Sequence, residues 1–133
     1  MLSARMLETH PRGPLDGPLS DAIDALYACA QACTACADAC LGEEMLADLR
    51  RCITLDLTCA DICLATGAAL SRQTEAKGVP LRHLLEACIE VCRVCAEECD
   101  RHADMHEHCQ VCAGACRACE EKCRAVLEVV QAR

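Results

Sequence analysis

Cysteine sets this sequence apart, because it accounts for 16 of the 133 residues. Four cysteines fall within the twelve-residue segment CAQACTACADAC at 29–40, in the pattern C-x3-C-x2-C-x3-C. At about 100° per residue, side chains three and four positions apart lie on one face of an α-helix. The spacing therefore predicts a single column of thiols along a helix, an arrangement suited to binding soft metal ions.

The column is repeated elsewhere in the chain. The segment CIEVCRVCAEEC at 88–99 has the same pattern at an offset of 59 residues, and the cysteines of 52–63 match those of 112–123 at an offset of 60. One position breaks the repeat, since Asp56 stands where the second copy has Cys116. The candidate metal ligands are the sixteen cysteines, namely Cys29, Cys33, Cys36, Cys40, Cys52, Cys59, Cys63, Cys88, Cys92, Cys95, Cys99, Cys109, Cys112, Cys116, Cys119 and Cys123.

The four columns continue the apolar stripes of their helices and are therefore predicted to face inward. A single buried cysteine usually serves only as a small apolar side chain. For sixteen aligned cysteines this reading is disfavoured, because Ala, Val or Leu would fill the space without the hazard of oxidation. Disulfides within a column fit poorly, since helix neighbours have Cβ atoms about 5–6 Å apart and a disulfide needs about 3.8 Å. Disulfides between helices stay possible but do not account for the spacing, whereas metal ligation does.

Charge and coordination number favour Cu(I) over other metals. Each zinc ion bound by four thiolates keeps a net charge of −2, which is costly inside a dry bundle. Iron–sulfur motifs place their cysteines on loops, and the continuous helix expected here leaves little room for a cubane cluster. Cu(I) is soft and can be held by two sulfurs. If each sulfur bridges two ions, sixteen thiolates hold about sixteen Cu(I) and the charges cancel.

Composition limits the location and partners that the sequence predicts. A cysteine share above roughly 8–10% is typical of secreted disulfide scaffolds. The first eighteen residues, however, contain no apolar run of the length an export signal requires, so we expect a cytoplasmic protein with reduced thiols. The net charge of −8 argues against nucleic acid or an anionic membrane as partner.

The predicted elements are all helical. Residues 1–17 contain or adjoin three of the four prolines and are expected to form a flexible tail. Pro18 and Ser20 suit the first turn and the cap of a helix that stops at Gly42. Further helices are expected at about 43–71, from Pro80 to about 102, and at about 108–131. Short links between four helices predict an all-α, antiparallel up-down bundle with a cysteine-lined core over 18–131.

The two ends of this bundle differ. Its mouth, as we call the end where Cys40, Cys52, Cys99 and Cys109 lie, also carries the candidate ligands Asp56, His102 and His108. Imidazole suits copper, and both histidines converge on the thiols. The roles of His106 and Met45 are left open, whereas His10 and His83 are expected to be solvated. The other end, called the apolar end, is expected to be closed by Leu26, Leu70, Leu84, Leu85 and Val126.

The C-x3-C and C-x2-C runs on all four predicted helices resemble those of the bacterial cytosolic copper storage proteins, over nearly the whole of 18–131. The resemblance implies a homotetramer of four-helix bundles, each loading many Cu(I) ions along its interior. It also implies metal-ligand roles for the sixteen cysteines and supports His and Asp ligands at the mouth. Storage would involve copper delivered by a chaperone or by small thiols.

A second class of function stays open at this point, namely an iron–sulfur or thiol-based redox protein. The sequence contains no Ser-His-Asp set and no phosphate-binding loop, so we do not expect an enzyme.

Overall fold

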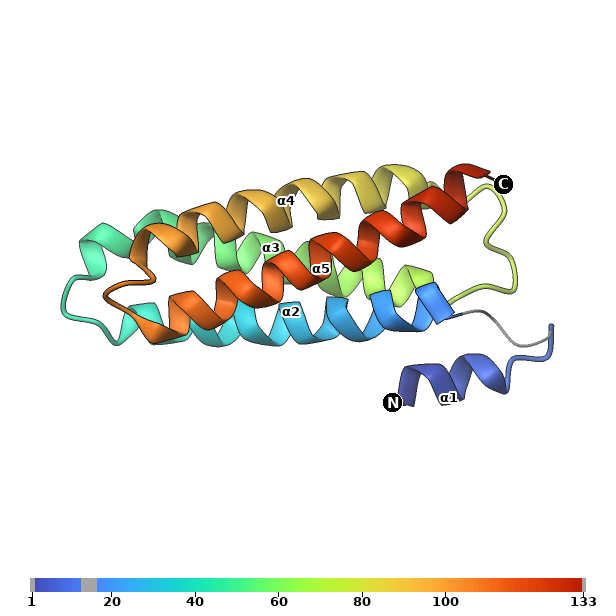
Figure 1. The fold of residues 1–133 in the computed structure, drawn as a ribbon, viewed down its shortest axis with the longest axis horizontal. Coiled ribbons are helices and arrows are strands. Elements are labelled where there is room, and N and C mark those ends of the chain that lie inside the picture. Colours follow the sequence, from blue (N-terminus) through green and yellow to red (C-terminus); the bar gives the residue numbers. More distant parts are fainter. Residues whose placement is uncertain (1, 13–16, 133) are drawn as a thin grey trace.

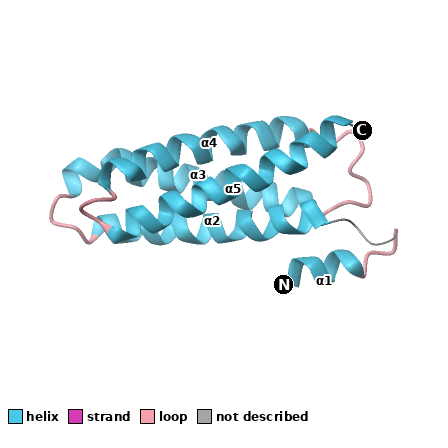
Figure 2. Cartoon of the chain, viewed as in Figure 1, coloured by secondary structure: helices cyan, strands magenta, loops and turns pink. Residues whose placement is uncertain are grey.

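The computed structural model describes residues 2–12 and 17–132, and these residues form helices and loops without a strand (Figure 2). Four long helices run alternately up and down and pack side by side (Figure 1), which confirms the predicted all-α four-helix bundle. The elements are α1 (Leu2–Glu8), α2 (Gly17–Leu41), the 3-10 helix η1 (Leu46–Leu49), α3 (Arg50–Leu70), α4 (Leu81–His102) and α5 (Glu107–Ala132).

The second long helix begins later than predicted. We expected it from about residue 43, but α3 starts at Arg50 after the short helix η1. An antiparallel partner needs room to reverse direction, and a helix starting at residue 43 would have left Gly42 alone to do so. Instead, Gly42 and Glu43 donate backbone hydrogen bonds to Ala39 and Cys40, tightening the end of α2 before the chain turns.

The other boundaries follow the sequence signals closely. Helix α2 ends at Leu41 beside Gly42, as predicted, but the Ser20 hydroxyl donates to the Gly17 carbonyl at 3.2 Å instead of capping a backbone N–H. Pro80 immediately precedes α4, where its missing N–H costs no helical hydrogen bond. In the link before it, Gly78 has φ +90°, a backbone conformation that disfavours every residue with a Cβ.

Part of the expected N-terminal tail is ordered as a helix. Helix α1 lies beside the start of α2 (Figure 1), and its Leu7 is buried with an exposed fraction of 4%. The Ser3 hydroxyl donates hydrogen bonds to the Ser20 carbonyl and to the Asp24 carboxylate. Residues 2–8 of the predicted flexible tail therefore form a helix, which the sequence analysis did not expect because it overlooked this apolar anchor. Residue 1 and residues 13–16 of that tail lie outside the described part.

The core is one continuous cluster that changes character along the bundle axis. Cysteines fill it from the mouth through the middle, and aliphatic side chains close the apolar end, where Leu26, Leu70 and Leu85 are at most 1% exposed. Val126 is also buried, whereas Leu84 is only partly so. Because cysteine and alanine make up most of this core, the four helix backbones can approach closely around the thiols.

The segment Leu46–Leu70 is long and apolar enough to cross a membrane by length and composition. A core helix of a bundle passes the same test. The Cys52, Cys59 and Cys63 side chains of this segment are fully buried against the other helices, so the bundle core accounts for part of its apolar character, whereas Leu57 and Leu64 are exposed.

This packing predicts that the bundle folds before any metal arrives. Neutral thiols pack as small apolar groups, unlike the ligands of a zinc finger, which fold only around their ion. The reduced, metal-free protein should therefore give the circular dichroism spectrum of a helical protein and unfold cooperatively on heating. A coil-like spectrum that becomes helical only on addition of metal would contradict the preformed core.

Candidate metal centre

All sixteen cysteines are free and line the centre of the bundle. None of their side chains is more than 2% exposed to solvent. Each of the four long helices contributes one column, because its cysteines are spaced three or four residues apart, or seven apart where Asp56 intervenes on α3, on the face that packs inward. The inward orientation predicted from the spacing is therefore confirmed for every cysteine.

Most of the sulfur atoms lie in close contact with one another along the axis. Within a column, the Cys29 and Cys33 sulfurs are 3.9 Å apart, one turn from each other. Between columns, Cys63 lies 3.8 Å from Cys92 and 3.9 Å from Cys119. These distances far exceed the roughly 2.05 Å of a disulfide bond, so the thiols are adjacent but not bonded.

Several groups of four sulfurs are compact enough to surround a metal ion. One of them takes a single cysteine from each long helix, and its ligand atoms all lie within 4.8 Å of one another: Cys29, Cys63, Cys92 and Cys119. Neighbouring groups share members, since Cys29 also belongs to the set Cys29, Cys33, Cys59 and Cys116. Shared members allow one sulfur to bridge two ions.

Asp56 occupies the cysteine position that the repeat leaves vacant, and it is fully buried. Its Oδ1 accepts hydrogen bonds from the thiols of Cys95 at 3.1 Å, Cys112 at 3.3 Å and Cys99 at 3.5 Å. Burial, together with the nearby Cys112 and Cys95 sulfurs, raises the pKa of Asp56 to about 10. The carboxyl group is therefore protonated and neutral at physiological pH in the metal-free protein.

The mouth brings a histidine into contact with the thiols. His108 Nδ1 lies 3.3 Å from the Cys36 sulfur and 3.6 Å from that of Cys109. With Cys40, these residues form a set whose ligand atoms lie within 4.8 Å of one another. His108 is thus the predicted histidine that the structure places among the cysteines.

Burial keeps the thiols of Cys40 and Cys109, near the mouth, protonated as well. Loss of solvent around Cys40 raises its pKa to about 11, and burial likewise raises the pKa of Cys109 above its ordinary value. A thiolate forms readily at these positions only when a cation arrives to balance its charge.

For His102, the contact that the structure describes is with a carboxylate. Its Nε2 lies 3.0 Å from Glu98, one turn earlier on α4. Glu98 is only 6% exposed and also lies 3.4 Å from Arg51 and 3.7 Å from Arg101. The spacing of four residues between Glu98 and His102 was a signal for this pair that the sequence reasoning missed.

The surroundings of His106 and Met45, whose roles the sequence left open, differ. His106 is 9% exposed, and its Nδ1 lies 3.1 Å from Glu43 in the turn after α2. Met45 lies in the same turn with an exposed fraction of 44%. Glu43 was missed because no sequence spacing connects it to a histidine more than sixty residues away.

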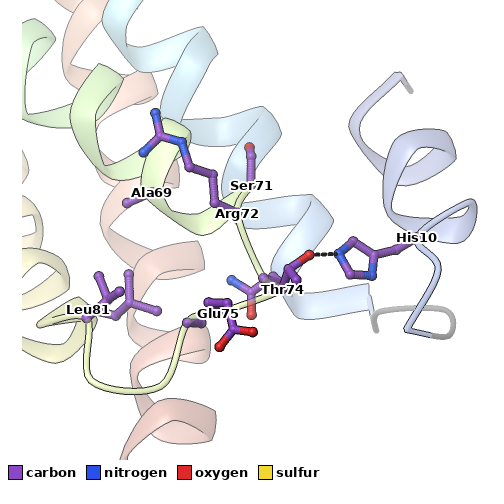
Figure 3. Close-up of a pocket in the computed structure, with 10 residues that line it drawn as sticks. His10, Ala69, Ser71, Arg72, Thr74, Glu75 and Leu81 are labelled. Carbon is purple, nitrogen blue, oxygen red and sulfur yellow. Dashed lines mark hydrogen bonds between the residues drawn. The ribbon is translucent and has the colours of Figure 1, made fainter.

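The apolar end offers no thiols to an incoming ion. A cavity of about 440 Å³ lies there against the link before α4, lined by residues that include Ala69, Arg72, Thr74 and Leu81 (Figure 3). His10 borders this cavity, and its Nε2 lies 3.2 Å from the Thr74 hydroxyl. No cysteine is among the residues that line the cavity.

The buried carboxyl group gives a testable dependence of stability on pH. The pKa of Asp56 rises from an ordinary value of 3.8 in the unfolded chain to about 10 in the fold, so the folded state holds a proton that the unfolded state has lost between these values. The stability that this proton adds to the fold is fully present below about pH 4. As the pH rises toward 10, the free energy of unfolding falls by up to about 1.4 kcal/mol per pH unit.

Asp56→Asn keeps a neutral side chain of the same shape and removes this proton. For the metal-free protein, the free energy of unfolding of the variant minus that of the wild type should therefore grow between pH 5 and pH 8 in denaturant titrations. A difference that stays constant over this range would show that Asp56 is ionised in the fold.

Comparison with known proteins supports one family. Residues 16–128 match the family described as copper storage protein. The chain is 38% identical over 93 residues to YhjQ, an uncharacterized cysteine-rich protein of Bacillus subtilis (strain 168), a match that covers 70% of this chain and 81% of the relative.

Two solved structures of the copper storage protein Ccsp from Streptomyces lividans are similar to this fold. The form loaded with 10 copper equivalents is 50% identical, with a TM-score of 0.90, and the match covers 95% of this chain and 98% of that chain. The form with five coppers is 53% identical, with a TM-score of 0.81, over 84% of this chain and 92% of that chain. The chain therefore belongs to the copper storage protein family.

Proposed function

We propose that the protein stores many Cu(I) ions in the bundle core, held by bridging thiolates of the sixteen cysteines. One observation carries the proposal: sixteen free, buried thiols line the axis, and fourteen of them have another sulfur at a separation of 3.6–4.0 Å. The two Streptomyces structures, with five and ten coppers, support the assignment of the metal and of a multiple load.

The sulfur spacing suits Cu(I) with two or three ligands. With metal–sulfur bonds of about 2.3 Å, three sulfurs around one ion lie about 4 Å apart, and two sulfurs on opposite sides lie about 4.6 Å apart. The observed separations are close to the first value and approach the second with small side-chain rotations. Each ion would displace one thiol proton, so the core stays neutral whether it is empty or full.

Copper would enter at the mouth, with Asp56, His102 and His108 as ligands in addition to the sixteen cysteines. His108 already contacts two thiols. His102 would offer its Nδ1, because Glu98 occupies its Nε2. Exposed fractions of 19% for the His102 side chain and 25% for that of His108 leave both within reach of a donor in solution.

The remaining features of the proposal concern the cellular setting. We propose a cytoplasmic homotetramer that receives copper from a chaperone or a small thiol and does not act on nucleic acid or membranes. It would sequester or supply copper and would not catalyse a reaction. The alternative of an iron–sulfur or thiol redox protein is less favoured, because the cysteines lie on continuous helices without the loops that hold such clusters.

The capacity of the core tests the bridging arrangement. Anaerobic titration of the reduced protein with Cu(I), against a competing chelator, should saturate at about one metal per thiolate or slightly above, as bridging two-coordinate sulfur requires. Saturation near four ions would refute bridging and would favour isolated four-thiolate sites.

Replacement of His102 and His108 tests whether copper enters at the mouth. The double variant His102→Ala with His108→Ala should keep the capacity of the deeper cysteines nearly intact, while Cu(I) uptake and removal by a chelator both become slower. Stopped-flow loading measures the rates, and His83→Ala, which removes an exposed histidine of α4 remote from the mouth, serves as the control. Unchanged rates in the double variant would mean that copper enters elsewhere.

A further inference from the structure

Glu43 connects two loops that meet at the mouth. It follows Gly42 in the turn after α2, and its side chain is 34% exposed. One carboxylate oxygen lies 3.1 Å from His106 Nδ1, and the other lies 3.6 Å from His108 Nε2. The two imidazole rings are stacked, with centroids 5.5 Å apart. One carboxylate of the first helical hairpin therefore faces two histidines of the second, His106 and His108.

The contacts of His108 determine which of its nitrogens can bind a metal. Nδ1 faces the sulfurs of Cys36 and Cys109, while Nε2 is buried without a hydrogen-bond partner among the described residues. A neutral imidazole has one N–H donor and one acceptor nitrogen. With the carboxylate of Glu43 in front of Nε2, the hydrogen belongs on Nε2, and the lone pair of Nδ1 points at the thiols.

We propose that Glu43 is a positioning residue for the His108 ligand. It holds Nε2–H toward its carboxylate and so presents Nδ1 to the first Cu(I) that reaches Cys36 and Cys109. Because metal binding at Nδ1 makes the opposite N–H a stronger donor, the gap of 3.6 Å closes to a hydrogen bond when copper arrives. The inference rests on the proposed function, since it concerns the entrance of the same store.

The arrangement of the other mouth histidine supports this reading. His102 is held through Nε2 by a carboxylate, Glu98, which leaves its Nδ1 available in the same way. In both pairs, the carboxylate of Glu98 or Glu43 thus faces Nε2 of the imidazole and leaves Nδ1 as the proposed metal ligand. The neighbouring Glu44 is exposed and, among the described residues, makes no ion pair, so it offers a matched charge without the contact.

Three variants separate positioning from charge. Glu43→Ala removes the acceptor and the charge, Glu43→Gln removes the charge but keeps an acceptor oxygen, and Glu44→Ala removes an equal charge nearby. Stopped-flow Cu(I) uptake should slow about tenfold in Glu43→Ala, the lower end of the roughly 10–100-fold losses in metal affinity or activity that follow removal of an outer-shell partner. It should slow about threefold in Glu43→Gln, since a neutral hydrogen bond has about half the strength of a charge-assisted one. It should stay at the wild-type rate in Glu44→Ala.

A second measurement uses the copper-free protein. Two-dimensional ¹H–¹⁵N spectra of the ring nitrogens should show a slowly exchanging Nε2–H and a proton-free Nδ1 for His108 in the wild type. The Nε2–H signal should broaden or vanish in Glu43→Ala and persist in Glu43→Gln and Glu44→Ala. Circular dichroism checks that each variant is folded as the wild type.

The outcomes are distinct. Wild-type uptake rates and an unchanged His108 signal in Glu43→Ala would overturn the positioning role, as would equal slowing by Glu43→Ala and Glu44→Ala, which would reveal a charge effect. If the wild type itself fails to take up Cu(I), the proposed function fails, and the copper-free spectra still decide whether Glu43 orients His108.

Discussion

A dry core cannot hold net charge without a large free-energy cost, and this constraint governs the whole arrangement of the bundle. Sixteen thiols satisfy it when they are protonated, and burial raises the pKa of the Cys40 thiol in this sense. Asp56 satisfies it in the same way, since its carboxyl group keeps its proton well above neutral pH and accepts hydrogen bonds from the surrounding thiols. A filled core satisfies it if each Cu(I) replaces one proton.

The two ends of the bundle follow from the same constraint. Where aliphatic side chains such as Leu26 and Leu85 close the core, neither ions nor water have a partner. At the mouth, the carboxylates are paired, as Glu43 is with His106 and Glu98 is with His102, and Glu43 is also partly exposed to solvent. Charged groups therefore lie at the mouth, where water can still screen them. The thiols deeper in the core bind the ion only as part of a neutral complex.

The sequence predicted the part of this arrangement that depends on local periodicity. Spacings of three and four residues fix the face of a helix, so the cysteine columns, the bundle and the break in the repeat at Asp56 were all accessible without coordinates. The contacts of Glu43 were not, because they join two loops whose meeting depends on how the hairpins pack. Helix α1 was missed for a similar reason, since its anchor Leu7 is meaningful only once the surface of α2 exists.

The central claim, that copper loads the core without changing its charge, is tested most directly by counting protons. Cu(I) is added anaerobically to the reduced protein in weak buffer near neutral pH, and the released acid is measured for each increment of metal. The account predicts about one proton per Cu(I) across nearly the whole titration, because each ion replaces one thiol proton. Release of several protons per ion, as four-thiolate sites with net negative charge would require, would contradict it.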